Sequence, residues 1–179
     1  HAIDHFKICV LDFICLDIGA STGGFTEVLI RKNVKKVYSV DVGTNQLHEK
    51  LLNNTKVINI PKTNARYLTE KIIPEMVNLI VCDVSFISMK KVIEPSLDFL
   101  EKNNGIIIAL IKPQFESVKK ELKKGGVIDN PEIHRRICED YRDWFTSRCK
   151  MKVIGITPSP IKGPKGNIEF LIYVKNSYR

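Results

Sequence analysis

The stretch from Asp17 to Phe25 has the residue types that a nucleotide-like ligand needs. It reads Asp-Ile-Gly-Ala-Ser-Thr-Gly-Gly-Phe, so an acidic residue precedes a glycine-rich turn at the end of an apolar run. Glycines let the backbone approach a ligand closely, and the free N–H groups of a following helix can face it. The spacing is neither that of dinucleotide folds nor that of a phosphate-binding loop, because no Gly-Lys-Ser/Thr follows. A purely structural turn would account for only one or two of these residues.

A carboxylate placed just before the glycines suits a ligand that carries a cationic or hydroxyl group. S-adenosylmethionine has both, in its amino acid head, its sulfonium and its ribose, and we predict it as the cofactor. The contacts predicted within this stretch are Asp17, Gly19, Ala20, Ser21, Thr22, Gly23, Gly24 and Phe25.

A second acidic residue, Asp41, ends the next apolar run and is followed by Val42. In open α/β sheets an acidic residue about 20 positions past the glycine loop can bind both ribose hydroxyls. The alternative is an ordinary aspartate in a turn. Asn64 and Ala65, after the third run, fall where an adenine would lie. That prediction is weaker, because asparagine is common in loops.

Three charged residues stand at the ends of further apolar runs and can act on a reacting group. Asp83 ends the fourth run, Lys112 follows the fifth and is held by Pro113, and Glu169 opens the last. Ligands in such sheets lie at the carboxyl ends of the strands near the point where the strand order reverses. We therefore expect Asp83 to face the same cleft as Gly19, and the lysine to lie beside a carboxylate. For each charge a solvated strand end is the alternative.

Phe86 lies just beyond Asp83 in Cys-Asp-Val-Ser-Phe-Ile-Ser. An aromatic ring at this place could stack on a nucleobase, as rings do in RNA sites. It could equally pack under the loop as a core residue. The sequence leaves both interpretations open.

The elements that must position these residues are apolar, β-branched runs that alternate with helical stretches. This alternation predicts an α/β fold with a mostly parallel sheet and helices on both faces, closed by an antiparallel C-terminal hairpin. The expected strands are Phe13–Ile18, Lys36–Asp41, Val57–Ile60, Leu79–Asp83, Ile106–Ile111, Met151–Thr157 and Glu169–Val174. The expected helices are Ala2–Cys9, Thr22–Lys32, Gln46–Asn53, Met89–Lys102 and Pro131–Phe145, and Pro95 predicts that the fourth kinks or begins there.

Composition limits the kinds of protein that this chain can be. The 179 residues, 44% of them hydrophobic, suit one domain, and 28 basic against 20 acidic residues give a formal charge of +8. That balance indicates a polyanionic partner such as RNA, or simply solubility. Five cysteines without metal-ligand spacing favour a reducing, cytoplasmic setting and no metal, with Cys15 and Cys82 buried as small hydrophobes. The longest apolar run, Ile106–Ile111, is too short to span a bilayer, and no signal peptide is visible.

Taken in order, these motifs resemble the TlyA (hemolysin A) family of S-adenosylmethionine-dependent ribosomal RNA methyltransferases, relatives of the FtsJ/RrmJ-type 2′-O-methyltransferases. The resemblance rests on Cys-Leu-Asp-Ile-Gly-Ala-Ser-Thr-Gly-Gly-Phe-Thr, Asp-Val-Gly, Thr-Asn-Ala-Arg, Cys-Asp-Val-Ser-Phe-Ile-Ser, Ile-Lys-Pro-Gln-Phe-Glu and Gly-Asn-Ile-Glu-Phe. It covers nearly all of the chain. The loop after Asp41 departs from the family pattern at Gly43-Thr44-Asn45-Gln46-Leu47-His48.

The resemblance implies a Rossmann-like sheet of seven strands and methyl transfer to a ribose 2′-hydroxyl of ribosomal RNA. It also implies a Lys-Asp-Lys-Glu catalytic set, of which Asp83, Lys112 and Glu169 match the last three members. The first lysine would lie just before the helix Ala2–Cys9, and Lys7 does not match its context. We therefore expect residues 1–179 to be the methyltransferase domain of a longer protein, without an N-terminal RNA-binding domain.

The chemistry required of such a set is plain, because a ribose hydroxyl is a poor nucleophile near neutral pH. A lysine beside two carboxylates must orient or deprotonate it, and the site must hold both partners in line. Two alternatives remain: a membrane-active hemolysin, against which the lack of an apolar span argues, and a module that binds cofactor and RNA without catalysis. The resemblance implies ribosomal RNA or a ribosomal subunit as partner, and the sequence predicts no membrane and no particular oligomeric state.

Overall fold

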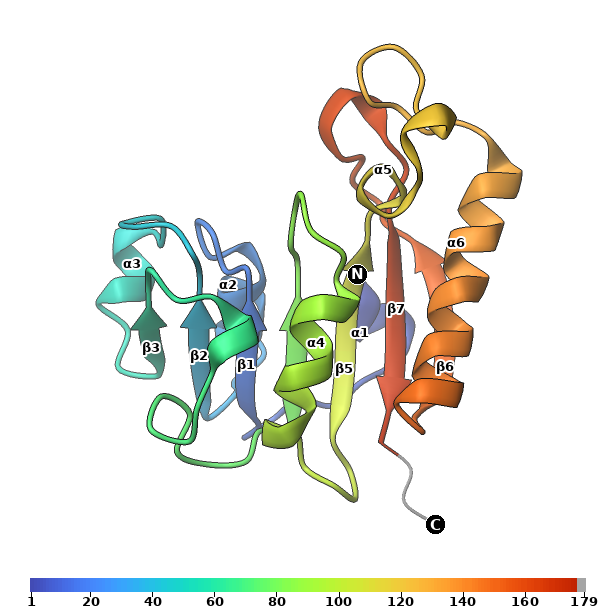
Figure 1. The fold of residues 1–179 in the computed structure, drawn as a ribbon. Helices are drawn as coiled ribbons and strands as arrows, with labels where there is room; N and C mark the ends of the chain where they lie inside the picture. The colour runs from blue at the N-terminus through green and yellow to red at the C-terminus, as the bar shows by residue number, and fades with distance from the viewer. Residues whose placement is uncertain (177–179) are drawn as a thin grey trace.

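Seven strands form a single sheet in the order β3-β2-β1-β4-β5-β7-β6, in a computed structural model that describes residues 1–176 (Figure 1). The strands β1 to β5 pair in parallel, whereas β7 runs antiparallel to both β5 and β6. This confirms the seven-stranded, mostly parallel sheet and its C-terminal hairpin. The strands are β1 (Ile14–Ile18), β2 (Lys36–Val40), β3 (Val57–Ile60), β4 (Leu79–Cys82), β5 (Ile106–Ile111), β6 (Lys152–Pro158) and β7 (Phe170–Lys175).

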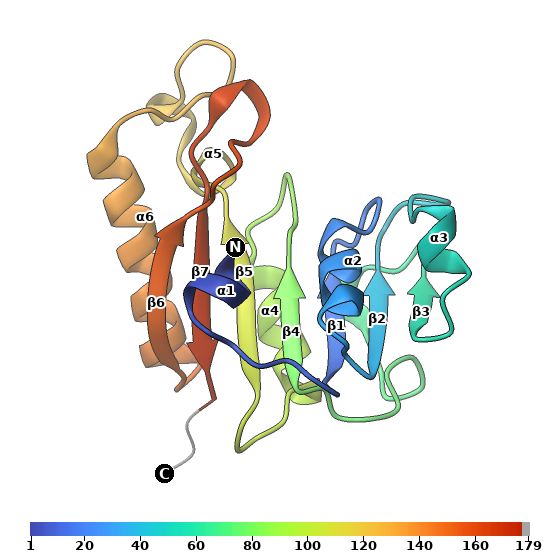
Figure 2. The same cartoon turned by 180° about the vertical axis from the view of Figure 1, so that it is seen from behind.

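The helices lie on both faces of this sheet, as the alternating pattern predicts. Figure 1 shows α4 and α6 in front of the strands, and Figure 2, from behind, shows α1 and α2 on the other face. The α-helices are α1 (Ala2–His5), α2 (Gly24–Arg31), α3 (Glu49–Leu52), α4 (Lys90–Ser96), α5 (Pro113–Glu116) and α6 (Pro131–Asp143). Short 3₁₀ turns follow at Ala65–Tyr67, Leu97–Phe99, Lys119–Glu121 and Pro164–Gly166, and a π-helical turn at Trp144–Arg148.

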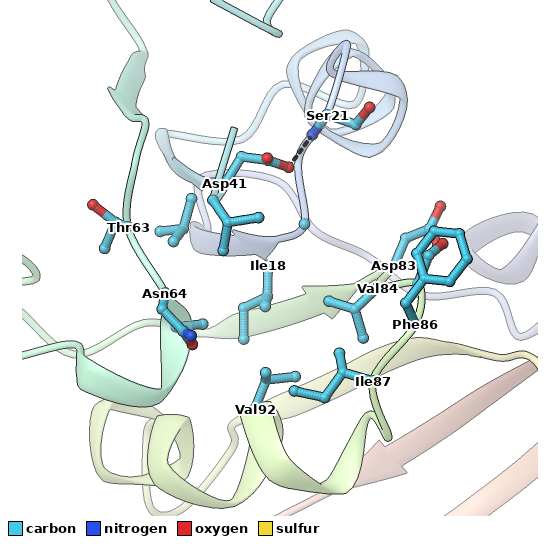
Figure 3. Close-up of a pocket in the computed structure, with 15 residues that line it drawn as sticks. Ile18, Ser21, Asp41, Thr63, Asn64, Asp83, Val84, Phe86, Ile87 and Val92 are labelled. Carbon is cyan, nitrogen blue, oxygen red and sulfur yellow. Dashed lines mark hydrogen bonds between the residues drawn. The ribbon is translucent and has the colours of Figure 1, made fainter. Parts of the chain in front are cut away.

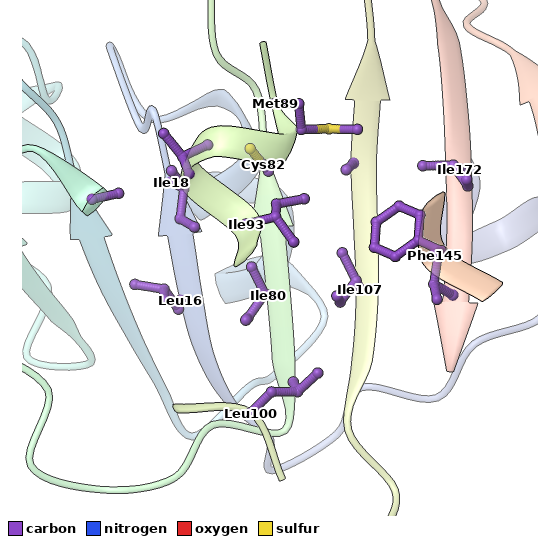
Figure 4. Close-up of a cluster of buried hydrophobic side chains, with 14 of the residues drawn as sticks. Leu16, Ile18, Ile80, Cys82, Met89, Ile93, Leu100, Ile107, Phe145 and Ile172 are labelled. Atoms are coloured by element: carbon purple, nitrogen blue, oxygen red, sulfur yellow. The ribbon is translucent and has the colours of Figure 1, made fainter. Parts of the chain in front are cut away.

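Side-chain alternation along the strands divides the core into two layers. In β1, Cys15 packs in the layer that contains Leu29 of α2, whereas Leu16 packs in the layer that contains Ile93 of α4. Figure 4 shows the second layer, in which Ile93 lies over the central strands and Phe145 lies near β5 and β7. Cys82 is also fully buried there. Because both faces of the central parallel strands β1, β2, β4 and β5 are buried, their sequences are nearly continuous apolar runs.

Three expected helices are shorter than the sequence predicts. The first ends at His5 because Lys7 adopts a positive φ of 53°. The second begins only at Gly24, since Gly23 has a φ of 100°. The third begins at Glu49, where the His48 side chain accepts a hydrogen bond from the backbone N–H of Lys50.

The helix predicted over Met89–Lys102 is also shorter, at Lys90–Ser96, and its proline does not have the predicted effect. Pro95 neither starts nor kinks this helix but stands one residue before its end, and a 3₁₀ turn continues the chain. Proline has no N–H to donate to the preceding turn, so the regular helix ends close to it. The sixth helix begins at Pro131 as predicted, because the Asn130 side chain accepts a hydrogen bond from the N–H of Glu132. Its α-helical part ends at Asp143, two residues before the expected end.

The strand order reverses between β1 and β4, which are neighbours although two strands separate them in the sequence. From β1 the chain moves outward to β2 and β3, then crosses back to β4 and continues to the other side. Ligands of open α/β sheets bind at such a reversal, outside the carboxyl ends of the strands. We therefore expect ligand-binding residues in the segments that follow β1, β2 and β4.

Candidate active site

The turn after β1 is shaped by Gly19, which adopts a φ of 79°. Its N–H and that of Ala20 both donate to the carbonyl of Val40, at 2.9 and 3.1 Å, and fix the turn to the end of β2. A Cβ atom at Gly19 would lie 2.3 Å from the carbonyl oxygen of Asp83. Only glycine fits between the two strand ends, which keeps the turn close to β4.

Asp41 joins this turn to the loop after β2. Its Oδ2 accepts a hydrogen bond from the Ser21 N–H at 2.8 Å, drawn in Figure 3, and its Oδ1 accepts one from the Gly43 N–H at 2.7 Å. Thr63 donates its N–H to the Asp41 carbonyl at 2.9 Å. A carboxylate oxygen can accept more than one hydrogen bond, so both oxygens retain acceptor capacity for a ligand.

A cavity of about 320 Å³ opens between these loops and the end of β4. Seven of the residues predicted to bind cofactor line it: Gly19, Ser21, Asp41, Val42, Asn64, Ala65 and Asp83. Its remaining wall comes from Ile18, Val40, Thr63, Val84, Ser85, Phe86, Ile87 and Val92. Figure 3 shows Ile18, Ile87 and Val92 gathered opposite Asp41, so the cavity has a carboxylate on one side and an apolar floor on the other.

The other predicted residues of the glycine string lie elsewhere. Ala20 is buried in a small apolar cluster, and Phe25 packs on the core layer beneath α2. Thr22, Gly23 and Gly24 line a separate hollow of about 270 Å³, next to α3. A Cβ at Gly23 would lie 2.2 Å from a methyl carbon of Leu51, so this glycine permits the close packing of α3.

Asp17 is fully buried beneath the turn, outside the lining of the cavity. Its Oδ2 accepts a 2.6 Å hydrogen bond from the hydroxyl of Thr26, which also lies 2.7 Å from the Ser39 hydroxyl. Its Oδ1 has no hydrogen-bond partner within residues 1–176. Burial raises the pKa of Asp17 to about 7. This carboxyl therefore anchors α2 to β1 in the present structure.

Asp83 and Lys112 meet at the carboxyl edge of the sheet, as the sequence predicts. The Lys112 Nζ lies 2.5 Å from Asp83 Oδ1 and donates to the Ser85 hydroxyl at 3.0 Å. The lysine side chain is 11% exposed and that of Asp83 34%, so the cation is more enclosed than its partner. Because Pro113 begins α5 directly after Lys112, the lysine is held at a strand end rather than on a free loop.

Glu169 is buried one residue before β7 and is held by a different partner. Its Oε1 accepts a 2.8 Å hydrogen bond from the side-chain amide of Gln114, two residues after Lys112. A Cβ at Gly163 would lie 2.1 Å from the same oxygen, so this glycine makes room for the carboxylate. In the described part of the chain no ion pair joins Glu169 to Lys112. The structure thus brings two of the three predicted catalytic residues into contact and attaches the third to the neighbouring turn.

Glu116 has a structural role near the site that sequence reasoning did not single out. Its Oε1 accepts hydrogen bonds from the Met89 N–H at 3.1 Å and from the Tyr141 hydroxyl at 2.5 Å. Burial and this carboxylate raise the pKa of Tyr141. Glu116 therefore ties α5 to the start of α4 and to α6. Its signal in the sequence is its place in the Lys-Pro-Gln-Phe-Glu string.

Phe86 is exposed rather than buried, which makes the core interpretation wrong. Its side chain is 89% exposed, its φ is 63°, and its ring lies 4.8 Å from that of Phe115. A positive φ is uncommon for a bulky residue and directs this ring away from the core. The ring borders the cavity beside Asp83, as Figure 3 shows.

The comparisons with known proteins agree with this arrangement. The family model for FtsJ-like methyltransferases matches residues 1–176. The chain belongs to the FtsJ-like methyltransferase family. It is 43% identical to hemolysin A of Brachyspira hyodysenteriae over 174 residues, which cover 96% of this chain and 71% of that protein. It is 37% identical to the 16S/23S rRNA (cytidine-2′-O)-methyltransferase TlyA of Mycobacterium tuberculosis, covering 97% of this chain and 64% of that one.

A solved structure gives the same result for the fold of this FtsJ-like chain. A hemolysin-like protein of Streptococcus thermophilus superposes with a TM-score of 0.92 at 37% identity, covering 98% of this chain and 63% of that one. The chain thus spans roughly two thirds of the length of these relatives. Within residues 1–176 no helix combines the length and apolarity needed to cross a membrane. The same residues contain no group of three or more His, Cys, Asp or Glu side chains placed to hold a metal ion.

Proposed function

We propose that this chain transfers a methyl group from S-adenosylmethionine to a ribose 2′-hydroxyl of ribosomal RNA. The observation that carries the proposal is one continuous site: Asp41 and Asp83 both line the cavity, and Lys112 pairs with Asp83 just outside its lining. The name of the M. tuberculosis relative states 2′-O-methylation of ribosomal RNA for that protein. We place the activity in residues 1–179 as a methyltransferase domain, and in the cytoplasm, where ribosomal RNA is found.

The cavity has the features that S-adenosylmethionine needs. Its volume of about 320 Å³ is in the range of small-ligand sites. The Asp41 carboxylate retains acceptor capacity for two ribose hydroxyls, and Ile87 and Val92 offer an apolar floor for the adenine. Asn64 and Ala65 line the same cavity, where the adenine would lie. The turn at Gly19 to Ser21 would hold the methionine end, close to Asp83.

When bound, S-adenosylmethionine supplies an electrophilic methyl group. Lys112 supplies the other requirement, a group that fixes the ribose hydroxyl. Its Nζ is held by Asp83 and Ser85, so it can donate to the hydroxyl oxygen and orient a lone pair toward the methyl. In its neutral form the same nitrogen accepts the hydroxyl proton, and Asp83 stabilises the ammonium that results. Fixed geometry of both partners contributes further powers of ten to the rate.

Phe86 and Glu169 have supporting roles in this proposal. The exposed ring of Phe86 offers a surface on which the target nucleobase can stack beside the cavity mouth. Glu169, held by Gln114, supplies a second carboxylate next to the lysine-bearing turn. The first lysine of the family's set has no counterpart at Lys7, which is exposed after α1.

The test is methyl transfer from radiolabelled S-adenosylmethionine to ribosomal RNA, followed by nuclease digestion and mass spectrometry of the nucleosides. The proposal predicts label in 2′-O-methylnucleosides and none in base-methylated ones. Label on a base would contradict it. A form extended to the length of the relatives, assayed in parallel, separates a module without catalysis from an enzyme that needs the additional residues.

A membrane-active function is the alternative suggested by the names of two relatives. Dye release from lipid vesicles tests it directly. Release by this chain in the absence of RNA methylation would favour that function over the present proposal.

A further inference from the structure

Two loops project together beyond the carboxyl edge of the sheet and form a lobe, which we define as residues 117–130 and 159–168. The first loop joins α5 to α6, and the second joins β6 to β7. Figures 1 and 2 both show them side by side, above α5. The two loops lie roughly 40 residues apart in sequence, so the lobe exists only through contacts made in the fold.

Polar contacts fix the two loops to each other. The buried side chain of Asn167 accepts a hydrogen bond from the Ile128 N–H at 2.9 Å and donates to the Gly126 carbonyl at 3.1 Å. The Lys165 Nζ donates to the Gly125 carbonyl at 2.7 Å. A backbone bridge between Lys123 and Val127 closes the first loop on itself. The lobe is therefore a built surface rather than two independent loops.

The lobe is strongly and asymmetrically charged. It contains six lysines and two acidic residues, so it carries a net +4 of the chain's formal +8. Both acids are already neutralised, Glu121 by a bidentate pair with Arg136 and Asp129 by Lys123. Within the lobe, whose residues all lie in the described part of the chain, the exposed ammonium groups without an acidic partner are those of Lys119, Lys120, Lys124, Lys162 and Lys165.

The lobe rests on the elements that carry the catalytic residues. Its first loop leaves α5, which begins directly after Lys112 and contains Gln114. Its second loop runs through Gly163, which packs against the Glu169 carboxylate, into β7. The Gln114–Glu169 hydrogen bond thus joins α5, which precedes the first loop, to the residue that follows the second loop, beside the reaction site. A polyanion bound to the lobe would lie at a fixed place relative to Lys112.

We propose that this lobe binds the RNA backbone next to the target nucleotide and so positions it over the Asp83–Lys112 pair. The proposal rests on the proposed function, and it adds the surface that contacts the substrate. Lysines that neutralise phosphates supply affinity without base readout, with a strong salt dependence. The exposed side chain of Ile161, beside Lys162, offers an apolar contact to an unstacked base. Continuity with the catalytic elements favours RNA over an anionic membrane surface.

The experiment compares two triple variants with matched charge loss. Lys119→Gln/Lys124→Gln/Lys162→Gln removes charge from the lobe, whereas Lys35→Gln/Lys102→Gln/Lys152→Gln removes it from exposed lysines at the opposite edge of the sheet. The readout is the fluorescence anisotropy of a labelled ribosomal RNA stem-loop, over a series of salt concentrations. Circular dichroism and calorimetric binding of S-adenosylmethionine check that both variants remain folded.

We expect the lobe variant to bind RNA about fiftyfold more weakly near physiological salt, since each phosphate contact contributes roughly four- to fivefold there. Its salt slope should fall by about two to three, and the control variant should change little. Equal losses in both variants, or no RNA binding by the parent chain, would overturn the proposal. So would a lobe-dependent affinity for anionic lipid vesicles without one for RNA. RNA binding needs no methyl transfer, so these results are independent of the outcome for the proposed reaction.

Discussion

The two walls of the candidate site are built in different ways, and in the second wall Lys112, Gln114 and Glu169 lie outside the lining of the cavity. On the side of β1 and β2, the backbone makes the site: the N–H groups of Gly19 and Ala20 bind the Val40 carbonyl, and the Ser21 N–H binds Asp41. On the side of β4, β5 and β7, side chains make it, because Lys112 pairs with Asp83 and Gln114 with Glu169 across 55 residues. The first wall is a contiguous motif that shapes a pocket. The second is an assembly of distant residues that can act on a proton.

This difference predicts that one wall binds the cofactor and the other acts on the ribose hydroxyl. Substitutions on the first wall should change cofactor affinity, and substitutions on the second should change methyl transfer at unchanged affinity.

Lys112→Ala should lower the transfer rate by roughly 10³- to 10⁴-fold, because a positioned acid–base group that also fixes the nucleophile contributes about this much. S-adenosylmethionine affinity should change by less than about twofold, since Lys112 does not line the cavity. Single-turnover methyl transfer measures the first quantity and calorimetry the second. Lys102→Ala, at an exposed lysine before β5, is the matched control. Transfer within tenfold of the parent would contradict a direct role for Lys112.

Asp17→Asn should change the pH dependence of stability. Burial raises the pKa of Asp17 to about 7, so the folded chain keeps a proton that the unfolded chain releases near pH 4. The stability contributed by this group is therefore fully present below about pH 4 and is lost as pH rises through about 7. Between pH 5 and pH 8 the parent should lose roughly 2 to 3 kcal/mol of unfolding free energy relative to the variant. Urea unfolding of both proteins at the two pH values measures this change. A difference in unfolding free energy between parent and variant that is the same at both pH values would contradict a raised pKa of Asp17.

Gln114→Ala should lower kcat about tenfold through loss of one charge-assisted hydrogen bond to Glu169. The KM for S-adenosylmethionine should stay unchanged, because Gln114 lies outside the cavity wall. Gln114→Glu should be more severe, since it places two carboxylates together. Steady-state kinetics of both variants are the measurement. Equal kcat values for parent and alanine variant would show that the pair is only structural.

Most of the fold could be predicted from the sequence because its central strands, β1, β2, β4 and β5, are buried on both faces. β3 and β5 have the predicted bounds, β1, β2 and β4 differ by one residue at one end, and β6 and β7 are each shifted by one residue at both ends. The helices were harder, because their ends depend on backbone conformations that periodicity does not reveal. The positive φ of Lys7 and of Gly23 shortens two of them. The cap at Asn130 was recognisable because the side chain and Pro131 act locally.

The site could be predicted where a residue acts through its place at a strand end. Asp41, Asp83 and Lys112 are such residues, and the parallel sheet brings their strand ends to one edge. The role of Glu116 was not predictable, because its partners Met89 and Tyr141 come together only in the fold. The apolar floor at Val92 likewise depends on how α4 packs. For the glycine string, sequence alone does not separate residues that face the cavity from those that support the turn.

Calorimetric titration with S-adenosylmethionine, performed on the parent, Asp41→Ala and Lys112→Ala, tests whether the cavity beside Asp41 binds the cofactor. We expect one binding site in the parent and nearly the same affinity in Lys112→Ala. We expect an affinity roughly tenfold to hundredfold weaker in Asp41→Ala, because a charged acceptor for the ribose is lost. Absence of binding heat from the parent, or an Asp41→Ala variant that binds as tightly as the parent, would contradict cofactor binding in this cavity.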